Sequence, residues 1–123
     1  MKIKTNELTG IALDWAVAKC KPEGMEFRPG YRGEPLLVDE HDFGHVFAPS
    51  TDWAQGGPIL TCEHISRTID HSGLWIAYRT DGYTEGDEGK KWMQCDRSEL
   101  VAGLRCYVAS ELGDEVDVPE ELI

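Results

Sequence analysis

The sequence has 123 residues, of which 41% are hydrophobic and 28% are charged, and this length and composition predict one globular domain spanning residues 1–123. Its 12 Lys and Arg residues against 23 Asp and Glu residues give a formal net charge of −11. That charge repels nucleic-acid phosphates and anionic membrane surfaces, so direct binding to nucleic acid or to a membrane is not expected.

The N-terminal segment lacks the apolar stretch of a signal peptide, and no apolar run approaches the length of a membrane span. A cytoplasmic location is therefore expected. The four cysteines, Cys20, Cys62, Cys95 and Cys106, are then predicted to be free thiols, because disulfides are uncommon in a reducing compartment. No motif for a cofactor is present, and none is predicted.

Residues 2–4 alternate like a short edge strand, and Thr5 or Asn6 can cap a helix over about residues 7–20. This helix is apolar on nearly every face. Such a helix is buried on several sides or contributes to a homo-oligomer interface, and both alternatives are kept.

The middle of the chain is punctuated by Gly and Pro over residues 22–35, which predicts an irregular connection. Residues 36–38 and 46–48 have the composition of two short strands that can pair as a hairpin. Residues 59–62 and 74–79 have the β-branched and aromatic content of central strands. The Gly-rich and acidic stretch between residues 79 and 91 predicts an exposed loop.

A second helix is predicted over residues 98–112, because Leu100, Leu104, Tyr107 and other apolar residues fall on one helical stripe. Ser98 is a candidate N-cap and Gly113 a C-terminal stop. Residues 116–118 can add a last edge strand. The elements together predict an α+β fold with a small mixed or antiparallel sheet and two main helices, at about 7–20 and 98–112.

Three segments carry a family resemblance: N-E-L-T-G-I-A-L-D-W-A-V-A-K-C, P-S-T-D-W-A-Q-G-G-P-I and L-R-C-Y-V-A-S-E-L-G-D-E-V-D-V-P-E-E-L. In this order they resemble the NinX-like family of lambdoid phage accessory proteins. The resemblance covers roughly residues 5–20, 49–59 and 100–122, whereas residues 21–48 and 60–99 depart from the pattern. It implies a phage protein acting in the cytosol of an infected host cell, but it implies no mechanism.

The segment D-W-A-Q-G-G-P, residues 52–58, is the most specific feature of the chain. Its glycines allow close backbone approach, Trp53 offers a stacking face, and the neighbouring polar side chains can form hydrogen bonds. One interpretation is a recognition loop for a nucleotide-like ligand, built from Ser50, Thr51, Asp52, Trp53, Gln55, Gly56 and Gly57. The other is a turn after a capped helical stub, with Ser50 or Asp52 as the cap and Trp53 in the core.

Arg79 and Arg105 are added to the predicted ligand site because guanidinium groups suit anionic ligands. The alternative for both is a salt bridge to the abundant carboxylates. Four side chains, His41, His45, Cys62 and His64, have the right chemistry for zinc but not the right spacing, so no metal site is predicted. Cys20 and Cys106 are interpreted as core residues rather than nucleophiles.

Two function classes follow from these residues and from the resemblance. In the first, a non-enzymatic counter-defence protein sequesters a small nucleotide-like host signal. In the second, the acidic C-terminal end, which has no Lys or Arg after Arg105, mimics nucleic-acid charge and inhibits a restriction or CRISPR enzyme. An interaction protein without a small ligand is the third alternative. No catalytic constellation is predicted, and Asp52 and His64 are the residues to inspect first for hydrolysis.

Overall fold

The computed structural model describes residues 1–20, 25–29, 35–39, 45–81 and 90–122. Within these ranges the strands are β1 (Lys2–Lys4), β2 (Met25–Pro29), β3 (Pro35–Asp39), β4 (His45–Val46), β5 (Ser66–Ile69), β6 (Trp75–Asp81), β7 (Lys90–Asp96) and β8 (Glu115–Asp117). The α-helices are α1 (Gly10–Cys20), α2 (Trp53–Cys62) and α3 (Glu99–Leu112), and two 3-10 turns are η1 (Thr5–Glu7) and η2 (Glu120–Leu122).

The described strands form three small antiparallel sheets. The first pairs β1 with β8, the second has the order β2-β3-β4, and the third has the order β5-β6-β7. The predicted α+β class is confirmed. The first sheet joins two segments from opposite ends of the sequence, in the register Ile3↔Val116.

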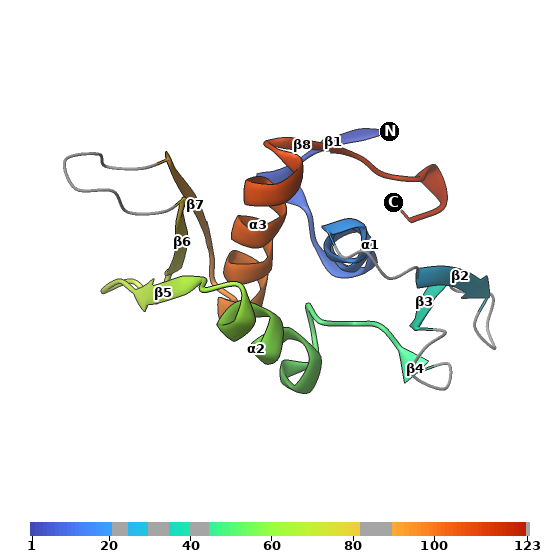
Figure 1. Ribbon diagram of the computed structural model, residues 1–123, viewed down its shortest axis with the longest axis horizontal. Coiled ribbons are helices and arrows are strands. Elements are labelled where there is room, and N and C mark those ends of the chain that lie inside the picture. Colours follow the sequence, from blue (N-terminus) through green and yellow to red (C-terminus); the bar gives the residue numbers. More distant parts are fainter. Residues whose placement is uncertain (21–24, 30–34, 40–44, 82–89, 123) are drawn as a thin grey trace.

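Helix α3 is the central element of the fold (Figure 1). The β5-β6-β7 sheet packs on one side of it, α1 on another, and α2 against its N-terminal half. Ser98 caps α3 by accepting a hydrogen bond from the Val101 amide, and Gly113 ends it with a φ of +94°, so the prediction for this helix is confirmed. Nearly every residue of α3 from Leu100 to Ala109 is buried. The neighbouring elements therefore pack around α3, which forms the centre of the core.

The predicted first helix is shorter than expected and starts later. Thr5 and Asn6 belong to the 3-10 turn η1, and α1 begins at Gly10, whose φ is +56°. The predicted Thr5 cap is wrong, because its hydroxyl donates instead to the Gly113 carbonyl at 2.7 Å and ties the two chain ends together. The apolar residues of α1 lie in the core of their own chain. Its all-round apolar character therefore does not require an oligomer interface, and oligomerisation through residues 7–20 stays a prediction.

A third helix, α2, replaces the strand predicted over residues 59–62. Ile59 and Leu60 face the core from this helix, and Leu60 lies against Gly103 of α3, where an added Cβ would come within 2.6 Å of the Leu60 side chain. A four-residue apolar run fits a buried strand and a buried helical turn equally well. The cap at Asp52, ten residues before Cys62, decides in favour of the helix.

The remaining predictions for strands are mixed. The predicted pairing of residues 36–38 with 46–48 is confirmed only in part: β3 pairs with β4 at Val38↔Val46, and residues 47 and 48 lie outside the strand. Strand β6 begins at Trp75 and covers the rest of the strand predicted at 74–79. Strand β2 lies inside the stretch that was expected to be irregular, and β5 and β7 were not predicted. Residues 82–89 of the predicted exposed loop lie outside the described residues. No helix in the described ranges is both long and apolar enough to cross a membrane.

Candidate functional site

The segment D-W-A-Q-G-G-P forms the start of α2 rather than a loop. Asp52 is the N-cap: its Oδ1 accepts a hydrogen bond from the Ala54 amide at 2.9 Å. The Gly56 amide donates to the Asp52 carbonyl at 2.8 Å within the first turn. These amides are used by the helix itself, so they do not converge on an open anion site. The Asp52 cap of the second interpretation is confirmed, but the segment continues as a helix instead of forming a turn.

Gln55 holds the preceding turn in place with its side-chain amide. Its Oε1 accepts from the Ala48 amide at 2.9 Å, and its Nε2 donates to the Val46 carbonyl at 2.9 Å and to Asp52 Oδ2 at 3.1 Å. The exposed Thr51 hydroxyl also donates to the Ala48 carbonyl, at 3.4 Å. The polar side chains that suggested ligand binding therefore serve the entry into α2.

Ser50 anchors this turn to α1 through a buried carboxylate. The Ser50 amide donates to Asp14 Oδ1 at 2.8 Å, and its hydroxyl donates to the Gly10 carbonyl at 3.5 Å. Asp14 is only 5% exposed. Burial raises the pKa of Asp14 to about 6 from its ordinary 3.8, although the Ser50 hydrogen bonds pull the pKa down.

We expect Asp14→Asn to stabilise the protein at pH 8 and to have little effect at pH 4. The folded state holds the Asp14 proton more tightly than the unfolded chain, because the pKa is about 6 in the folded state and 3.8 in the unfolded chain. Above pH 6 the buried carboxylate is charged, which lowers the stability of the folded state. This loss of stability disappears as the pH falls from about 6 to 3.8. Asparagine keeps the acceptor for the Ser50 amide without the charge. The expected gain at pH 8 is about 1 to 2 kcal/mol, measured by denaturant unfolding at both pH values. An equal loss of stability at pH 8 and pH 4 would contradict this account.

The two glycines of the motif have different surroundings, although neither has a positive φ. A Cβ on Gly56 would come within 2.4 Å of the Pro49 carbonyl oxygen and 2.6 Å of Leu100 Cδ2. A Cβ on Gly57 would lie 3.5 Å from Trp53 Cε3, an ordinary contact. Gly56 is therefore required where α2 approaches the backbone of the preceding turn, and Gly57 is not.

Trp53 lies at the surface with 51% of its area exposed, so the interpretation of Trp53 as a core residue is wrong. It belongs to the outward side of α2, which we call the Trp53 face and which consists of Trp53, Ala54, Gly57, Pro58, Thr61 and Cys62. No residue of α2 is charged, although 28% of the whole chain is. Pro58 has no amide proton, so the Ala54 carbonyl lacks its usual helical donor on this face.

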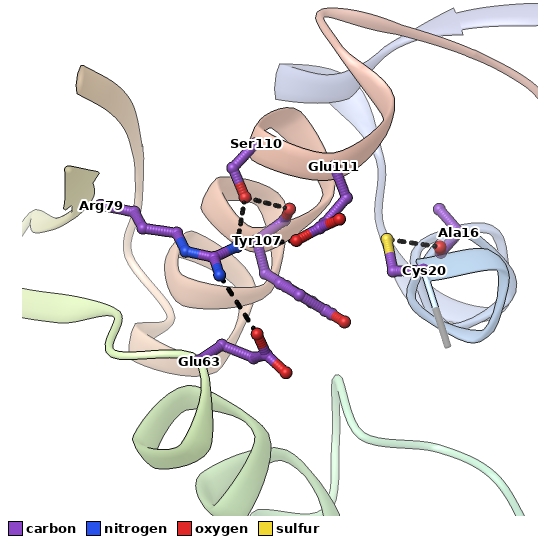
Figure 2. A network of polar contacts seen from close by, with 7 residues as sticks. All are labelled: Ala16, Cys20, Glu63, Arg79, Tyr107, Ser110 and Glu111. Carbon is purple, nitrogen blue, oxygen red and sulfur yellow. Dashed lines mark hydrogen bonds and ion pairs between the residues drawn. The ribbon is translucent and has the colours of Figure 1, made fainter. Parts of the chain in front are cut away.

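Arg79 is part of an ion-pair network that joins β6, α3 and the end of α2 (Figure 2). Its guanidinium donates to Ser110 Oγ at 2.7 Å, to Glu111 Oε1 at 3.0 Å and to Glu63 Oε2 at 3.2 Å. It also lies 5.7 Å from the centre of the Tyr107 ring. The network uses the cation within the protein, which is the salt-bridge alternative for Arg79.

Arg105 is 6% exposed and joins the segment between η1 and α1 to the end of β7. Its Nε donates to the Leu8 carbonyl at 2.8 Å, and its Nη1 donates to Asp96 Oδ1 at 3.1 Å and to the Cys95 carbonyl at 3.4 Å. Seven of the predicted ligand-binding residues thus lie together around the start of α2: Ser50, Thr51, Asp52, Trp53, Gln55, Gly56 and Gly57. The other two, Arg79 and Arg105, form their hydrogen bonds with residues outside this group. Their partners are 9 to 97 residues distant in sequence, beyond what local patterns can reveal.

Cys20 and Cys106 have the character of packed residues rather than nucleophiles, whereas Cys62 and Cys95 are exposed. All four cysteines are unpaired. Burial raises the pKa of Cys20 to about 12 and that of Cys106 to about 11, which keeps both protonated near neutral pH. Cys20 donates a weak hydrogen bond to the Ala16 carbonyl, as Figure 2 shows.

The candidate metal and hydrolytic residues do not assemble in the parts of the chain that the structure describes. Within these parts, no three His, Cys, Asp or Glu side chains could hold one metal ion, and His41 lies outside them. Asp52 and His64 stand at opposite ends of α2. A surface pocket of about 320 Å³, which the sequence did not suggest, lies elsewhere and is lined by Lys4, Asn6, Gln94, Asp114 and Glu115.

The acidic C-terminal end is accompanied by positive charge from the start of the chain. Strand pairing places Lys2 opposite Asp117 and Lys4 opposite Glu115. The N-terminal amine lies 3.0 Å from Asp117 Oδ1 and also donates to the Val118 carbonyl at 2.9 Å. The negative patch expected from sequence is therefore interleaved with three cationic groups.

Comparison with known proteins gives a family. A search of curated proteins finds no match. A family model described as bacteriophage P22, NinX matches residues 4–111. The match extends through residues 21–48 and 60–99, which were expected to be particular to this chain, and it includes the whole of α2. It stops before most of the acidic C-terminal end. The chain therefore belongs to the NinX family of phage accessory proteins.

Proposed function

We propose that this phage accessory protein is a non-enzymatic binding protein that contacts another protein through the Trp53 face of α2. The observation that carries the proposal is the half-exposed Trp53 on a helix without a single charged residue, in a protein that is otherwise rich in surface charge. Tryptophan is strongly enriched among residues that dominate binding energy at protein interfaces.

The chemistry of the Trp53 face fits a largely apolar contact. Ala54, Gly57 and Pro58 are small or rigid, so they lose little side-chain entropy when a partner covers them. Because Pro58 cannot donate to the Ala54 carbonyl, we expect the partner to donate a hydrogen bond there. Because Asp52 and Gln55 are already engaged with backbone groups, this surface is held rigidly before binding, which lowers the cost of association.

A nucleotide-like ligand is the second candidate, and the exposed Trp53 ring is the observation in its favour, since bases stack on aromatic side chains. The surroundings supply little for the phosphates. Arg79 and Arg105 are engaged inside the protein, and the net charge of −11 repels anions. Sequestration of a host signal would therefore depend on contacts with the base.

Inhibition of a host enzyme by charge mimicry is supported by the exposed acids after Arg105 but weakened by the interleaved cations. Lys2, Lys4 and the N-terminal amine lower the charge density along the β1-β8 sheet. A mimic of this kind would lose its partner steeply as salt rises. An apolar contact through α2 would not, so salt dependence separates the two proposals.

The proposal is tested by affinity purification from infected host cells with wild type, Trp53→Ala and Trp53→Phe. We expect a partner recovered with wild type at about 0.5 M salt, lost with Trp53→Ala and largely kept with Trp53→Phe. Ile69→Ala is the matched control, because Ile69 is 52% exposed on a different element and should keep the partner. Equal recovery with Trp53→Ala and wild type would refute the proposal.

The nucleotide alternative is tested by melting temperature in a panel of nucleotides and cyclic nucleotides. A ligand that binds only the folded state raises the melting temperature by mass action. A rise with wild type that vanishes in Trp53→Ala would favour this alternative. No rise across the panel at about millimolar ligand would rule it out.

A further inference from the structure

We propose that Glu63, Glu111 and Tyr107 form a binding site for a primary ammonium group. The three side chains are called the ammonium site below. They lie around Arg79, where the end of α2, the C-terminal part of α3 and strand β6 meet (Figure 2). The proposal does not depend on the proposed function, because a free amine can supply the ammonium group without any contact to Trp53.

The two carboxylates of the site share one cation. Glu63 Oε2 accepts a hydrogen bond from one terminal nitrogen of Arg79 at 3.2 Å, and Glu111 Oε1 accepts from the other at 3.0 Å. Both carboxylates therefore lie close together on one guanidinium. In the described part of the chain, Arg79 is the only cation paired with either of them. Two negative charges against one positive charge leave the group with a charge of −1, which attracts a second cation.

The Tyr107 hydroxyl is the observation that points to a ligand. Tyr107 is 3% exposed, and a buried tyrosine usually has a hydrogen-bond partner for its hydroxyl. Among the described residues this hydroxyl has none. No side-chain nitrogen or oxygen there is fully buried without a partner, so the hydroxyl of Tyr107 is open to solvent.

The hydroxyl is directed toward the carboxylates. Figure 2 shows the hydroxyl end of Tyr107 between Glu63 and Cys20. Burial, together with the charges of Cys20, Glu63 and Glu111, raises the pKa of Tyr107 to about 12, although Arg79 lowers it. Both carboxylates are thus near enough to act on the hydroxyl, which stays protonated and uncharged at neutral pH.

The free oxygens of this group match a primary ammonium. Such a group has three N–H donors and no acceptor. Glu63 Oε1, Glu111 Oε2 and the Tyr107 hydroxyl oxygen are three acceptors that no described residue occupies. Bonds from an ammonium to carboxylates are charge-assisted and stronger than neutral hydrogen bonds. A metal ion fits less well, because no three His, Cys, Asp or Glu side chains in the described ranges could hold one.

The site is accessible from solvent, since Glu63 is 34% exposed and Glu111 is 41% exposed. Two sources can supply the ammonium group: a free amine, or a lysine side chain of the protein that binds the Trp53 face. Glu63 directly follows the last residue of α2, and a helix of this length spans about 15 Å. The second source rests on the proposed function, whereas the first does not.

Titration of the full chain with n-butylammonium near neutral pH tests the site, with the NMR signals of the Glu63 and Glu111 backbone amides as the readout. We expect saturable shifts with a dissociation constant on the order of 1 mM, as for a very small ligand. Butyltrimethylammonium carries the same charge but no N–H donor, and it should cause no saturable shift. The Tyr107 ring offers it no alternative, because Arg79 already lies 5.7 Å from the ring centre.

Tyr107→Phe removes only the hydroxyl and should weaken n-butylammonium binding at least about tenfold. Its melting temperature should not fall, because this hydroxyl has no partner in the described part of the folded chain. Glu63→Gln should also weaken binding. Glu99→Gln is the matched control for it: the change removes the same charge from the ion pair with Arg67, and binding should equal that of wild type.

Three results would overturn the proposal: no saturable shift with n-butylammonium, equal binding of butyltrimethylammonium, or unchanged n-butylammonium binding by Tyr107→Phe. Affinity purification with Tyr107→Phe then separates the two sources. Loss of the partner that wild type recovers would assign the ammonium to a lysine of that partner, and full recovery would assign it to a free amine. The titration needs no partner, so its result stands even if Trp53→Ala refutes the proposed function.

Discussion

Replacing Gly56 with alanine is expected to destabilise the protein by about 2 to 4 kcal/mol. The added Cβ would lie 2.4 Å from the Pro49 carbonyl oxygen and 2.6 Å from Leu100 Cδ2. The carbonyl belongs to backbone that cannot move freely, because the next residue, Ser50, is bound to Asp14 on α1. Helix α2 would have to move away from the turn and from α3. Denaturant unfolding measures the loss.

Gly57→Ala is the matched control for this prediction. It is the same substitution one residue later in the same helix, and its Cβ would meet only the Trp53 ring at 3.5 Å. Alanine is favoured over glycine in a helix by about 1 kcal/mol, so Gly57→Ala should be neutral or stabilising. If both variants were destabilised to the same extent, the close approach at Gly56 would not be the reason for glycine there.

Replacing Arg105 with methionine is expected to cost about 2 to 4 kcal/mol. Methionine fills much of the space of the arginine stem, but it removes the donor of the buried Leu8 carbonyl and one donor of the Cys95 carbonyl. Asp96, which is 31% exposed, keeps its bond from the Ser98 amide. Unpaired buried polar groups are costly because neither water nor protein compensates them. Arg105 also links η1 and α1 to the sheet through α3, so the loss affects contacts between distant parts of the chain.

Arg67→Met provides the comparison for Arg105→Met. Arg67 pairs with Glu99 at 3.0 Å, but both side chains are 24% exposed and water can replace the bond. A pair of this kind contributes about 1 kcal/mol or less. Thermal and denaturant unfolding should therefore separate the two variants clearly. Similar small losses in both would show that the buried network around Arg105 is not needed for stability.

The parts of the fold that sequence predicted correctly are those governed by local rules. The stripe of α3, its Ser98 cap and its Gly113 stop are all encoded within sixteen consecutive residues, 98–113. Helix α2 was missed because its C-terminal half is a short apolar run that contains a proline and no charged residue. The helix also packs Leu60 against Gly103 of α3, a contact between distant segments that local patterns do not reveal.

The candidate site was located by sequence but its geometry was not. The D-W-A-Q-G-G-P motif does contain the exposed Trp53, and sequence left open whether that ring was buried. The sequence offered Asp52 as a helix cap, and the structure confirms it. The sequence could not show that Gln55 and Gly56 serve the helix start, since their neighbours are Val46, Ala48 and Pro49 in a turn that Asp14 holds in place. Arg79 and Arg105 were plausible anion ligands until their internal partners were visible.

The central claim, that Trp53 is the main contact of a protein-binding surface, is tested most directly by the dissociation constant for the partner recovered with wild type. Calorimetric titration at about 0.5 M salt should show at least roughly 30-fold weaker binding for Trp53→Ala, as for an interface residue worth about 2 kcal/mol, with an unchanged fold. Trp53→Phe should lose much less. A dissociation constant for Trp53→Ala equal to that of wild type would contradict the claim.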